Sequence, residues 1–176
     1  AAGSHSRGAS VLRHLPTPPL RPRLSLHDAV TAERPLLVWI DGGARGNPGE
    51  AGCGIVIAHP DGRRERHSVY LGHTTNNVAE YAALLAALER VAEIRPSAIV
   101  VRSDSELLVR QVSGRYRVKA PHLQRLWARV RELSASLPAF TVRHVRREEN
   151  READSLANLA IDTQRSTLPR PVAVPK

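Results

Sequence analysis

Two aspartates stand at the ends of apolar segments that have the character of buried strands. Asp41 directly follows the run 36–40, and Asp104 comes shortly after a second apolar run, 98–101. Continuous apolar runs of this length are typical of central strands that are buried on both faces. Sites in α/β sheets lie at the carboxyl ends of strands, so the pair indicates a functional site, although either aspartate alone could merely cap its strand.

Two further acids border the apolar faces of predicted helices. Glu80 lies close to Val78 in a segment with apolar residues at three- and four-residue steps, and Asp154 lies between Ala153 and Leu156 in a later segment of the same kind. Each of these acids alone could be a surface residue at the edge of the core.

The chemistry of the four acids makes sense if they converge. Four carboxylates within a few ångströms repel one another and do not all ionise unless cations lie between them. Ligand sets made only of oxygen atoms favour Mg²⁺ or Mn²⁺ over zinc. Two such ions about 4 Å apart suit in-line hydrolysis of a phosphodiester, because one ion activates water while the other stabilises the leaving oxygen.

Alternating strands and helices must position these acids. Turn signals such as Asp61-Gly62 bound the apolar runs, the segment 74–76 has the residues of a helix start, Pro121 suits a first helical position, and Asn150 is a candidate cap for the last helix. The predicted strands are 36–40, 52–59, 65–71, 98–101 and 140–145, and the predicted helices end near residues 92, 112, 133 and 161. The order β-β-β-α-β-α-α-β-α predicts an α/β domain with a mixed sheet.

Length and composition fit one folded domain. The chain has 176 residues, of which 41% are hydrophobic. It contains no apolar run of the roughly 18 residues that a membrane span needs, which excludes an integral membrane protein. Cys53 is the single cysteine in the sequence. It excludes an internal disulfide framework and a cysteine-based zinc finger, and it favours a reducing, cytoplasmic compartment.

The charge balance predicts a polyanionic partner. Lys and Arg number 26 against 17 Asp and Glu, a net charge of +9 that fits nucleic acid. An alternative explanation is a GC-rich genome, because nearly all of the basic residues are arginines. More than half of the excess lies outside residues 36–165, in a Pro- and Arg-rich extension, 1–35, predicted to be disordered, and in a basic tail, 166–176.

Four motifs together carry a resemblance to a known family. They are Asp41-Gly42-Gly43-Ala44-Arg45-Gly46-Asn47-Pro48-Gly49, Thr74-Thr75-Asn76-Asn77-Val78-Ala79-Glu80, Ser103-Asp104-Ser105 and Glu149-Asn150-Arg151-Glu152-Ala153-Asp154. In this order they resemble type 1 ribonuclease H over residues 36–165. The resemblance implies a ribonuclease-H-like fold, with a five-stranded mixed sheet flanked by helices.

The same resemblance implies an activity and a site. The expected enzyme is an endonuclease that cuts the RNA strand of an RNA/DNA hybrid and leaves 5′-phosphate and 3′-hydroxyl ends. Asp41, Glu80, Asp104 and Asp154 match the family's catalytic and metal-binding acids, which hold two Mg²⁺ ions, with Mn²⁺ as a substitute. Asn47, Asn76 and Asn77 match hybrid-binding positions; otherwise, Asn47 would be a turn residue and Asn76 a helix cap. The expected protein is a monomer without an obligate protein partner.

Two departures place the chain with a shorter, archaeal-like branch of the family. The loop 145–149 lacks the histidine that many members carry, and strand alternation places His144 in the sheet edge or core, so phosphate contacts from Arg146 or Arg147 are favoured. The basic helix and loop found in many members are also missing, because the chain runs from Gly114 straight to Pro121. Hybrid affinity must then come from elsewhere, and the Arg-rich ends are candidates.

Two other functions stay open. One is a domain of the same fold that holds hybrids without cutting them, and the other is a same-fold nuclease that acts on double-stranded RNA or DNA junctions. The bulky Trp39 and Trp127 and the small Cys53 are expected in the core rather than in a site.

Overall fold

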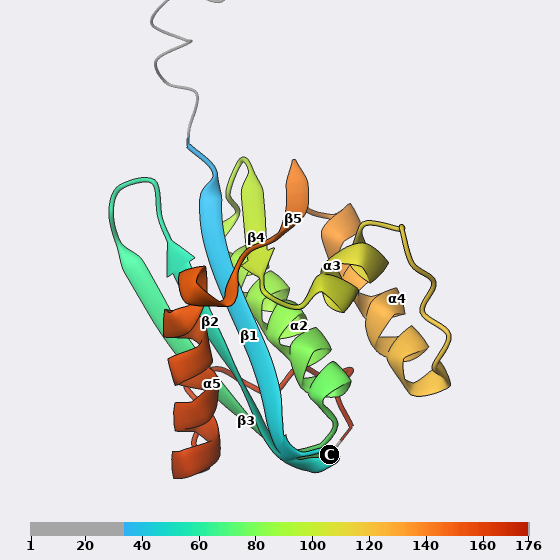
Figure 1. Cartoon of the computed structure of the whole chain (residues 1–176). Helices are drawn as coiled ribbons and strands as arrows, with labels where there is room; N and C mark the ends of the chain where they lie inside the picture. Colours follow the sequence, from blue (N-terminus) through green and yellow to red (C-terminus); the bar gives the residue numbers. More distant parts are fainter. Residues whose placement is uncertain (1–33, 176) are drawn as a thin grey trace, which may run out of the picture. The chain divides into compact units, whose positions relative to one another are not determined.

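Five strands form one mixed sheet in the computed structural model, which describes residues 34–175 (Figure 1). The strand order is β3-β2-β1-β4-β5. β1 pairs antiparallel with β2 and β2 with β3, whereas β4 and β5 run parallel to β1. The predicted five-stranded mixed sheet is thus confirmed. The strands are β1 (Leu36–Gly46), β2 (Gly49–Ala58), β3 (Arg64–Thr74), β4 (Ile99–Ser103) and β5 (Phe140–His144).

Residues 34–175 form four α-helices and one short 3-10 helix, and three of the α-helices begin where the local sequence favours a start. Thr75 caps the first helix by accepting a hydrogen bond from the Val78 amide, and Ser105 caps the next in the same way. Pro121 opens the third. Within the described residues, none of these helices is both long enough and apolar enough to span a membrane. The helices are α2 (Asn76–Ile94), α3 (Glu106–Val112), α4 (Pro121–Ala135), η1 (Arg147–Glu149) and α5 (Arg151–Thr163).

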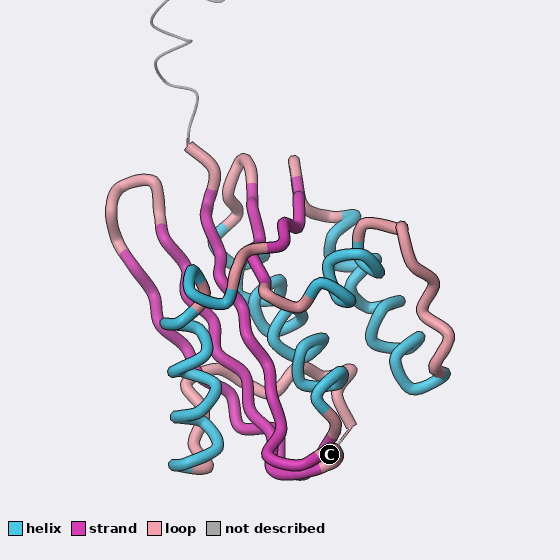
Figure 2. The backbone as a smooth tube through the Cα atoms, viewed as in Figure 1, coloured by secondary structure: helices cyan, strands magenta, loops and turns pink. Residues whose placement is uncertain are grey.

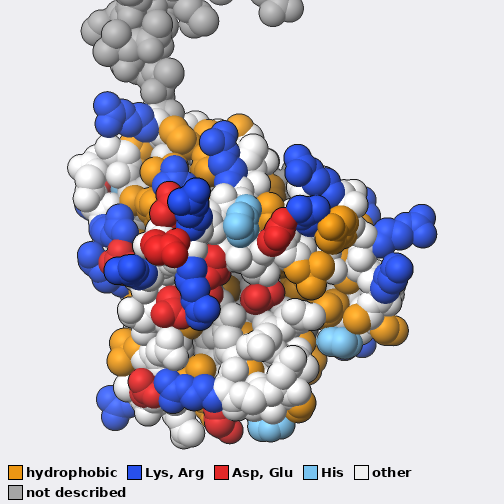
Figure 3. Space-filling model, in the orientation of Figure 1, with side chains coloured by type: hydrophobic (Ala, Val, Ile, Leu, Met, Phe, Trp, Pro, Cys, Tyr) orange, Lys and Arg blue, Asp and Glu red, His pale blue; other side chains and the backbone are white. Residues whose placement is uncertain are grey.

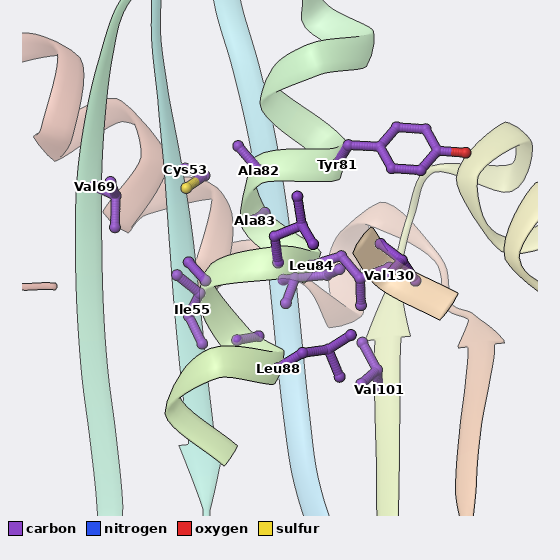
Figure 4. Packing of buried hydrophobic residues seen from close by; sticks show 14 of the residues in the cluster. Cys53, Ile55, Val69, Tyr81, Ala82, Ala83, Leu84, Leu88, Val101 and Val130 are labelled. Atoms are coloured by element: carbon purple, nitrogen blue, oxygen red, sulfur yellow. The ribbon is translucent and has the colours of Figure 1, made fainter. Parts of the chain in front are cut away.

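The helices cover the two faces of the sheet. α2 packs on one face with α4 behind it, and α5 packs on the other face over β2, β3 and β1 (Figure 1). The core lies between the sheet and α2, where Leu84 and Leu88 meet Ile55 and Val101 (Figure 4). Cys53 is fully buried there, as predicted. α2 is buried on most of its surface because it lies between the sheet and α4.

Trp39 is not in this core, contrary to the sequence-based expectation. On β1, Leu36, Val38 and Ile40 point into the core, so the intervening Trp39 points to the face of α5, where it is half-buried. Trp127, on α4, packs at the border of the core.

Within the described residues, the segment after α5 contains no helix or strand; it contacts the outer strand β3 and then runs across the sheet (Figure 2). The hydroxyl of Thr167 accepts a hydrogen bond from the Ser68 amide, and the hydroxyl of Ser166 accepts one from the Tyr70 amide. Val174 is buried against the core. The residues expected to form a basic tail therefore pack on the domain, whereas the predicted extension lies outside the described residues except for positions 34 and 35.

Candidate active site

Two glycines, one on β1 and one on β2, allow both helix layers to approach the sheet beside Asp41. Gly54 lies directly opposite Asp41 in the sheet, and a Cβ atom on Gly54 would stand 2.1 Å from the backbone oxygen of Ala153 on α5. A Cβ atom on Gly42 would stand 2.2 Å from the backbone oxygen of Ala79 on α2. Real Cβ atoms do not make such short contacts, so side chains at these positions would push the helices outward. The missing side chains bring Glu80 and Asp154 close to Asp41.

All four acids line one hollow of about 560 Å³. Asp41 comes from β1, Glu80 from the second turn of α2, Asp104 from the residue after β4, and Asp154 from the first turn of α5. Among the other predicted site residues, Asn47, Asn76, Asn77 and Arg147 line the same hollow. Arg146 is exposed beside it and does not line it. The structure therefore brings together eight of the nine residues that the sequence singled out.

Two of the acids in this hollow, Asp41 and Glu80, resist ionisation. Burial, followed by repulsion from Asp104 and Asp154, raises the pKa of Asp41 from 3.8 to about 7. Burial also raises the pKa of Glu80; a hydrogen bond opposes this shift, because the Ser105 hydroxyl donates to Glu80 Oε2 over 2.7 Å. Bringing negative charge into this space therefore costs free energy that a bound cation would offset.

The donor set suits a hard divalent cation. The hollow offers carboxylate and amide oxygens, which are the ligands of Mg²⁺ and Mn²⁺. In the part of the chain that the structure describes, no three His, Cys, Asp or Glu side chains are placed as a metal-binding group. The residues fit such an ion by type and by charge, and ligation requires the repelling carboxylates to turn towards it.

The asparagines use one end of each side chain to fix the backbone. Asn76 Oδ1 accepts a hydrogen bond of 2.7 Å from the Ala44 amide, and Asn47 Oδ1 accepts one of 3.2 Å from the Asn76 amide. These bonds join the β1–β2 turn to the start of α2, and Thr75 rather than Asn76 is the helix cap. Neither Nδ2 group has an acceptor among the described residues, so both can donate to a ligand.

Asn150 has a different role from the one expected of it. It precedes α5, but its side chain makes no capping bond. Its Nδ2 group donates instead to the backbone oxygen of Ile40 over 2.9 Å and lies 3.4 Å from Asp104 Oδ1. Asn150 therefore ties the Asp104 carboxylate to β1. A sequence signal was available, because Asn150 precedes Asp154 by one helical turn and so shares its side of the helix.

His144 lies in the edge strand β5, one of the two places that strand alternation allowed, and not in the core. It is exposed at the end of this strand, and its Nε2 lies 3.2 Å from the backbone oxygen of Asp104. Ser105, which fixes Glu80, is another residue whose role the motif alone did not show.

The fold and the acid-lined hollow define an α/β protein of the kind that acts on phosphodiesters, and comparison with known proteins specifies the family. The family described as "Reverse transcriptase-like" matches residues 40–160. A protein named Ribonuclease HI from Halobacterium salinarum is 41% identical over 125 residues, which cover 70% of this chain and 63% of that protein. Ribonuclease H from Halorhodospira halophila is 36% identical over 140 residues, 70% of this chain and 91% of the relative.

Solved structures agree with these relatives. The crystal structure of RNase H1 from Halobacterium salinarum superimposes with a TM-score of 0.70 at 39% identity, covering 74% of this chain and 99% of the other. LC11-RNase H1 in complex with an RNA/DNA hybrid gives a TM-score of 0.70 at 43% identity, covering 73% and 98%. The chain belongs to the type 1 ribonuclease H family. It spans about two thirds or less of some relatives: 63% of the Halobacterium protein and 35% of the mycobacterial bifunctional protein Rv2228c.

Proposed function

We propose that the protein is an endonuclease that hydrolyses the RNA strand of RNA/DNA hybrids and leaves 5′-phosphate and 3′-hydroxyl ends. The observation that carries this proposal is the single hollow in which four acids meet the amides of Asn47, Asn76 and Asn77. The related LC11-RNase H1, which was crystallised with an RNA/DNA hybrid, supports the same substrate class.

Each group in the hollow has a defined task in this reaction. Asp41, Glu80, Asp104 and Asp154 would hold two Mg²⁺ ions, or Mn²⁺ in their place. When bound, these ions supply an activated water and neutralise the charge that develops on the leaving oxygen. Ser105 orients Glu80, and Asn150 orients Asp104.

The substrate would be held by neutral and basic groups around the acids. The Nδ2 groups of Asn47 and Asn76, with the exposed Asn77, suit base edges and the ribose 2′-hydroxyl, which marks the strand to cut. Arg147 in the hollow and Arg146 beside it suit the phosphates of the same strand. We also propose that the protein acts as a monomer in the cytoplasm without an obligate protein partner.

A cleavage assay with a labelled hybrid tests this function. The chain should cut the RNA strand with Mg²⁺ and not with EDTA, and Asp104→Asn should abolish cutting while the protein remains folded. Asp61→Asn is the matched control, because Asp61 is an exposed acid on the turn between β2 and β3 and should leave cutting unchanged. Binding without cleavage would favour a hybrid-holding domain. Preferential cutting of double-stranded RNA or DNA junctions would favour a different nuclease of the same fold.

A further inference from the structure

A row of arginines crosses the sheet next to the acid-lined hollow. Trp39 on β1 is in register with Arg102 on β4, and Arg102 is in register with Arg143 on β5. On the other side, Trp39 pairs through Val56 of β2 with Arg66 of β3. Residues in register point to the same face of a sheet, so this row lies on the face of α5.

Trp39 holds two of the nearby arginines in place. The guanidinium groups of Arg64 and Arg102 lie over its ring, 5.1 and 5.0 Å from the centroid. Glu152 on α5 bridges the side chains of Arg64 and Arg66. Because Trp39 is covered by guanidinium groups, it is a poor platform for a nucleic acid base and serves to orient positive charge instead.

Three hollows join this row to the active site. The acid-lined hollow shares Arg147 and Asp154 with a second hollow of about 430 Å³ at the start of α5. That second hollow shares Arg151 with a third, of about 170 Å³, which Trp39 and Arg64 line. Shared lining residues therefore connect Asp154 to the tryptophan step by step. We use the name arginine track for three arginines along these hollows, for Trp39 and for the arginine over its ring: Arg147, Arg151, Arg64, Trp39 and Arg102.

The hollows of the track hold acids as well as arginines: Glu148 lines both the second and the third hollow, and Glu149 and Glu152 line the third. None of Arg102, Arg147 and Arg151 forms an ion pair with an acid among residues 34–175. Arg64 and Arg66 share the single carboxylate of Glu152. Figure 3 shows Lys and Arg side chains interleaved with acids on this side of the molecule. A surface with unpaired guanidinium groups suits a partner that carries regularly spaced negative charges.

We propose that the arginine track binds the sugar–phosphate backbone of the hybrid beyond the point of cutting. The inference rests on the proposed function, since it takes the occupant of the acid-lined hollow to be a nucleic acid duplex. Asp41 and Trp39 are two residues apart on one face of β1, so their Cα atoms are about 6.7 Å apart. A strand bound at the acids therefore reaches the track within its next nucleotides. The track also supplies positive charge to a chain without a basic insertion between α3 and α4.

Salt dependence of hybrid binding tests the track. Each phosphate contact contributes about 0.7–0.9 to the slope of log affinity against log salt, so the double variant Arg102→Gln, Arg151→Gln should lower the slope by roughly 1.4–1.8. Between about 50 and 200 mM salt the variant should lose roughly tenfold less affinity than the parent chain. Binding is measured by fluorescence anisotropy in EDTA, so that no strand is cut. Arg151 is the first residue of α5, where loss of a positive charge does not weaken the helix.

Arg131→Gln is the matched control. Arg131 also lies over a tryptophan ring, 4.8 Å from the centroid of Trp127, but on α4, which packs behind α2 on the other face of the sheet. A slope that falls in the double variant but not in the Arg131 control supports the track. Trp39→Leu keeps every charge and should weaken hybrid binding, because it releases Arg64 and Arg102.

Three results would overturn the inference: equal slopes in the double variant and the parent, an equal fall in the Arg131 control, or a double variant that has unfolded while Arg151→Gln alone leaves the slope unchanged. The proposed function is judged separately, by whether the parent chain cuts the hybrid with Mg²⁺. A chain that cuts normally but shows no change in slope rejects the track alone.

Discussion

Neutralising Asp41 should stabilise the metal-free protein. Burial and the nearby Asp104 and Asp154 raise the pKa of Asp41 from 3.8 to about 7. One pKa unit corresponds to about 1.4 kcal/mol, so ionising this carboxyl costs at most about 4 kcal/mol of folding free energy. Two effects reduce this figure: the repulsion is shared with Asp104, and an amide at position 41 keeps only part of the hydrogen bonding of the carboxyl. We therefore expect Asp41→Asn to raise the free energy of unfolding by about 1–3 kcal/mol at pH 8.

The sign of the pH dependence follows from the direction of the shift. A carboxyl with a raised pKa in the folded state holds its proton more tightly there than in the unfolded chain. Stability from this group is fully present below pH 3.8 and is lost as the pH rises through about 7. The difference in unfolding free energy between Asp41→Asn and the parent, here called the gap, should therefore be near zero at low pH and largest at high pH. Added Mg²⁺ should narrow the gap, because the parent binds the ion better.

Thermal unfolding in EDTA measures this gap. At pH 8 the variant should melt roughly 3–10 °C above the parent, whereas cleavage of the hybrid with Mg²⁺ should be lost. Asp61→Asn, at an exposed turn, should show neither change. A variant that is less stable than the parent at pH 8, or a gap that does not vary with pH, would refute the electrostatic reasoning.

Three further changes test the supports of the site and of the sheet. Gly54→Ala should lower the free energy of unfolding by more than about 2 kcal/mol and reduce kcat by displacing α5, whereas Gly43→Ala, where no atom lies within 4 Å, should leave the melting temperature unchanged. Asn150→Ala should lower the free energy of unfolding by about 1–2 kcal/mol, because the Ile40 oxygen and Asp104 lose a hydrogen-bond donor. It should also lower kcat more than it changes KM. Glu65→Gln should lower the free energy of unfolding by up to about 3 kcal/mol at pH 7, because hydrogen bonds from Arg90, and also from His67 and His59, lower the pKa of Glu65 to about 2. That difference should close as the pH falls from about 4.5 to 2 in urea titrations, since a lowered carboxyl pKa stabilises the fold only above this window.

The acids and the elements that carry them were predictable because their signals are local. Asp41 and Asp104 follow apolar runs, and Thr75 and Pro121 mark helix starts by chemistry that acts within one turn. The convergence of the four acids was expected only from the order of the motifs. Its physical basis is the close approach of α2 and α5 at Gly42 and Gly54, a property of two strands and two helices that no single segment displays.

The error at Trp39 and the exposure of His144 share one cause. Alternation along a strand tells which side chains share a face, but not whether another layer covers that face. α5 covers β2 and β3 more than the strands beyond β1, so the last residue of β5 is exposed, and arginines rather than a helix flank Trp39. A tryptophan between two guanidinium groups satisfies the same apolar pattern as one in a core.

Asn150 shows why an amide is needed at the centre of the acid cluster. Its position is almost fully buried, between the backbone oxygen of Ile40 and the carboxylate of Asp104, both of which are acceptors. An aspartate there would add a fifth negative charge, and an aliphatic residue would leave both oxygens without a donor. An amide supplies the donor without charge, and its Oδ1 is buried without a partner in the described structure. The site thus combines acids that repel one another with neutral donors, Asn150 and Ser105, that fix their orientation, so that a cation can relieve the repulsion without reorganising the fold.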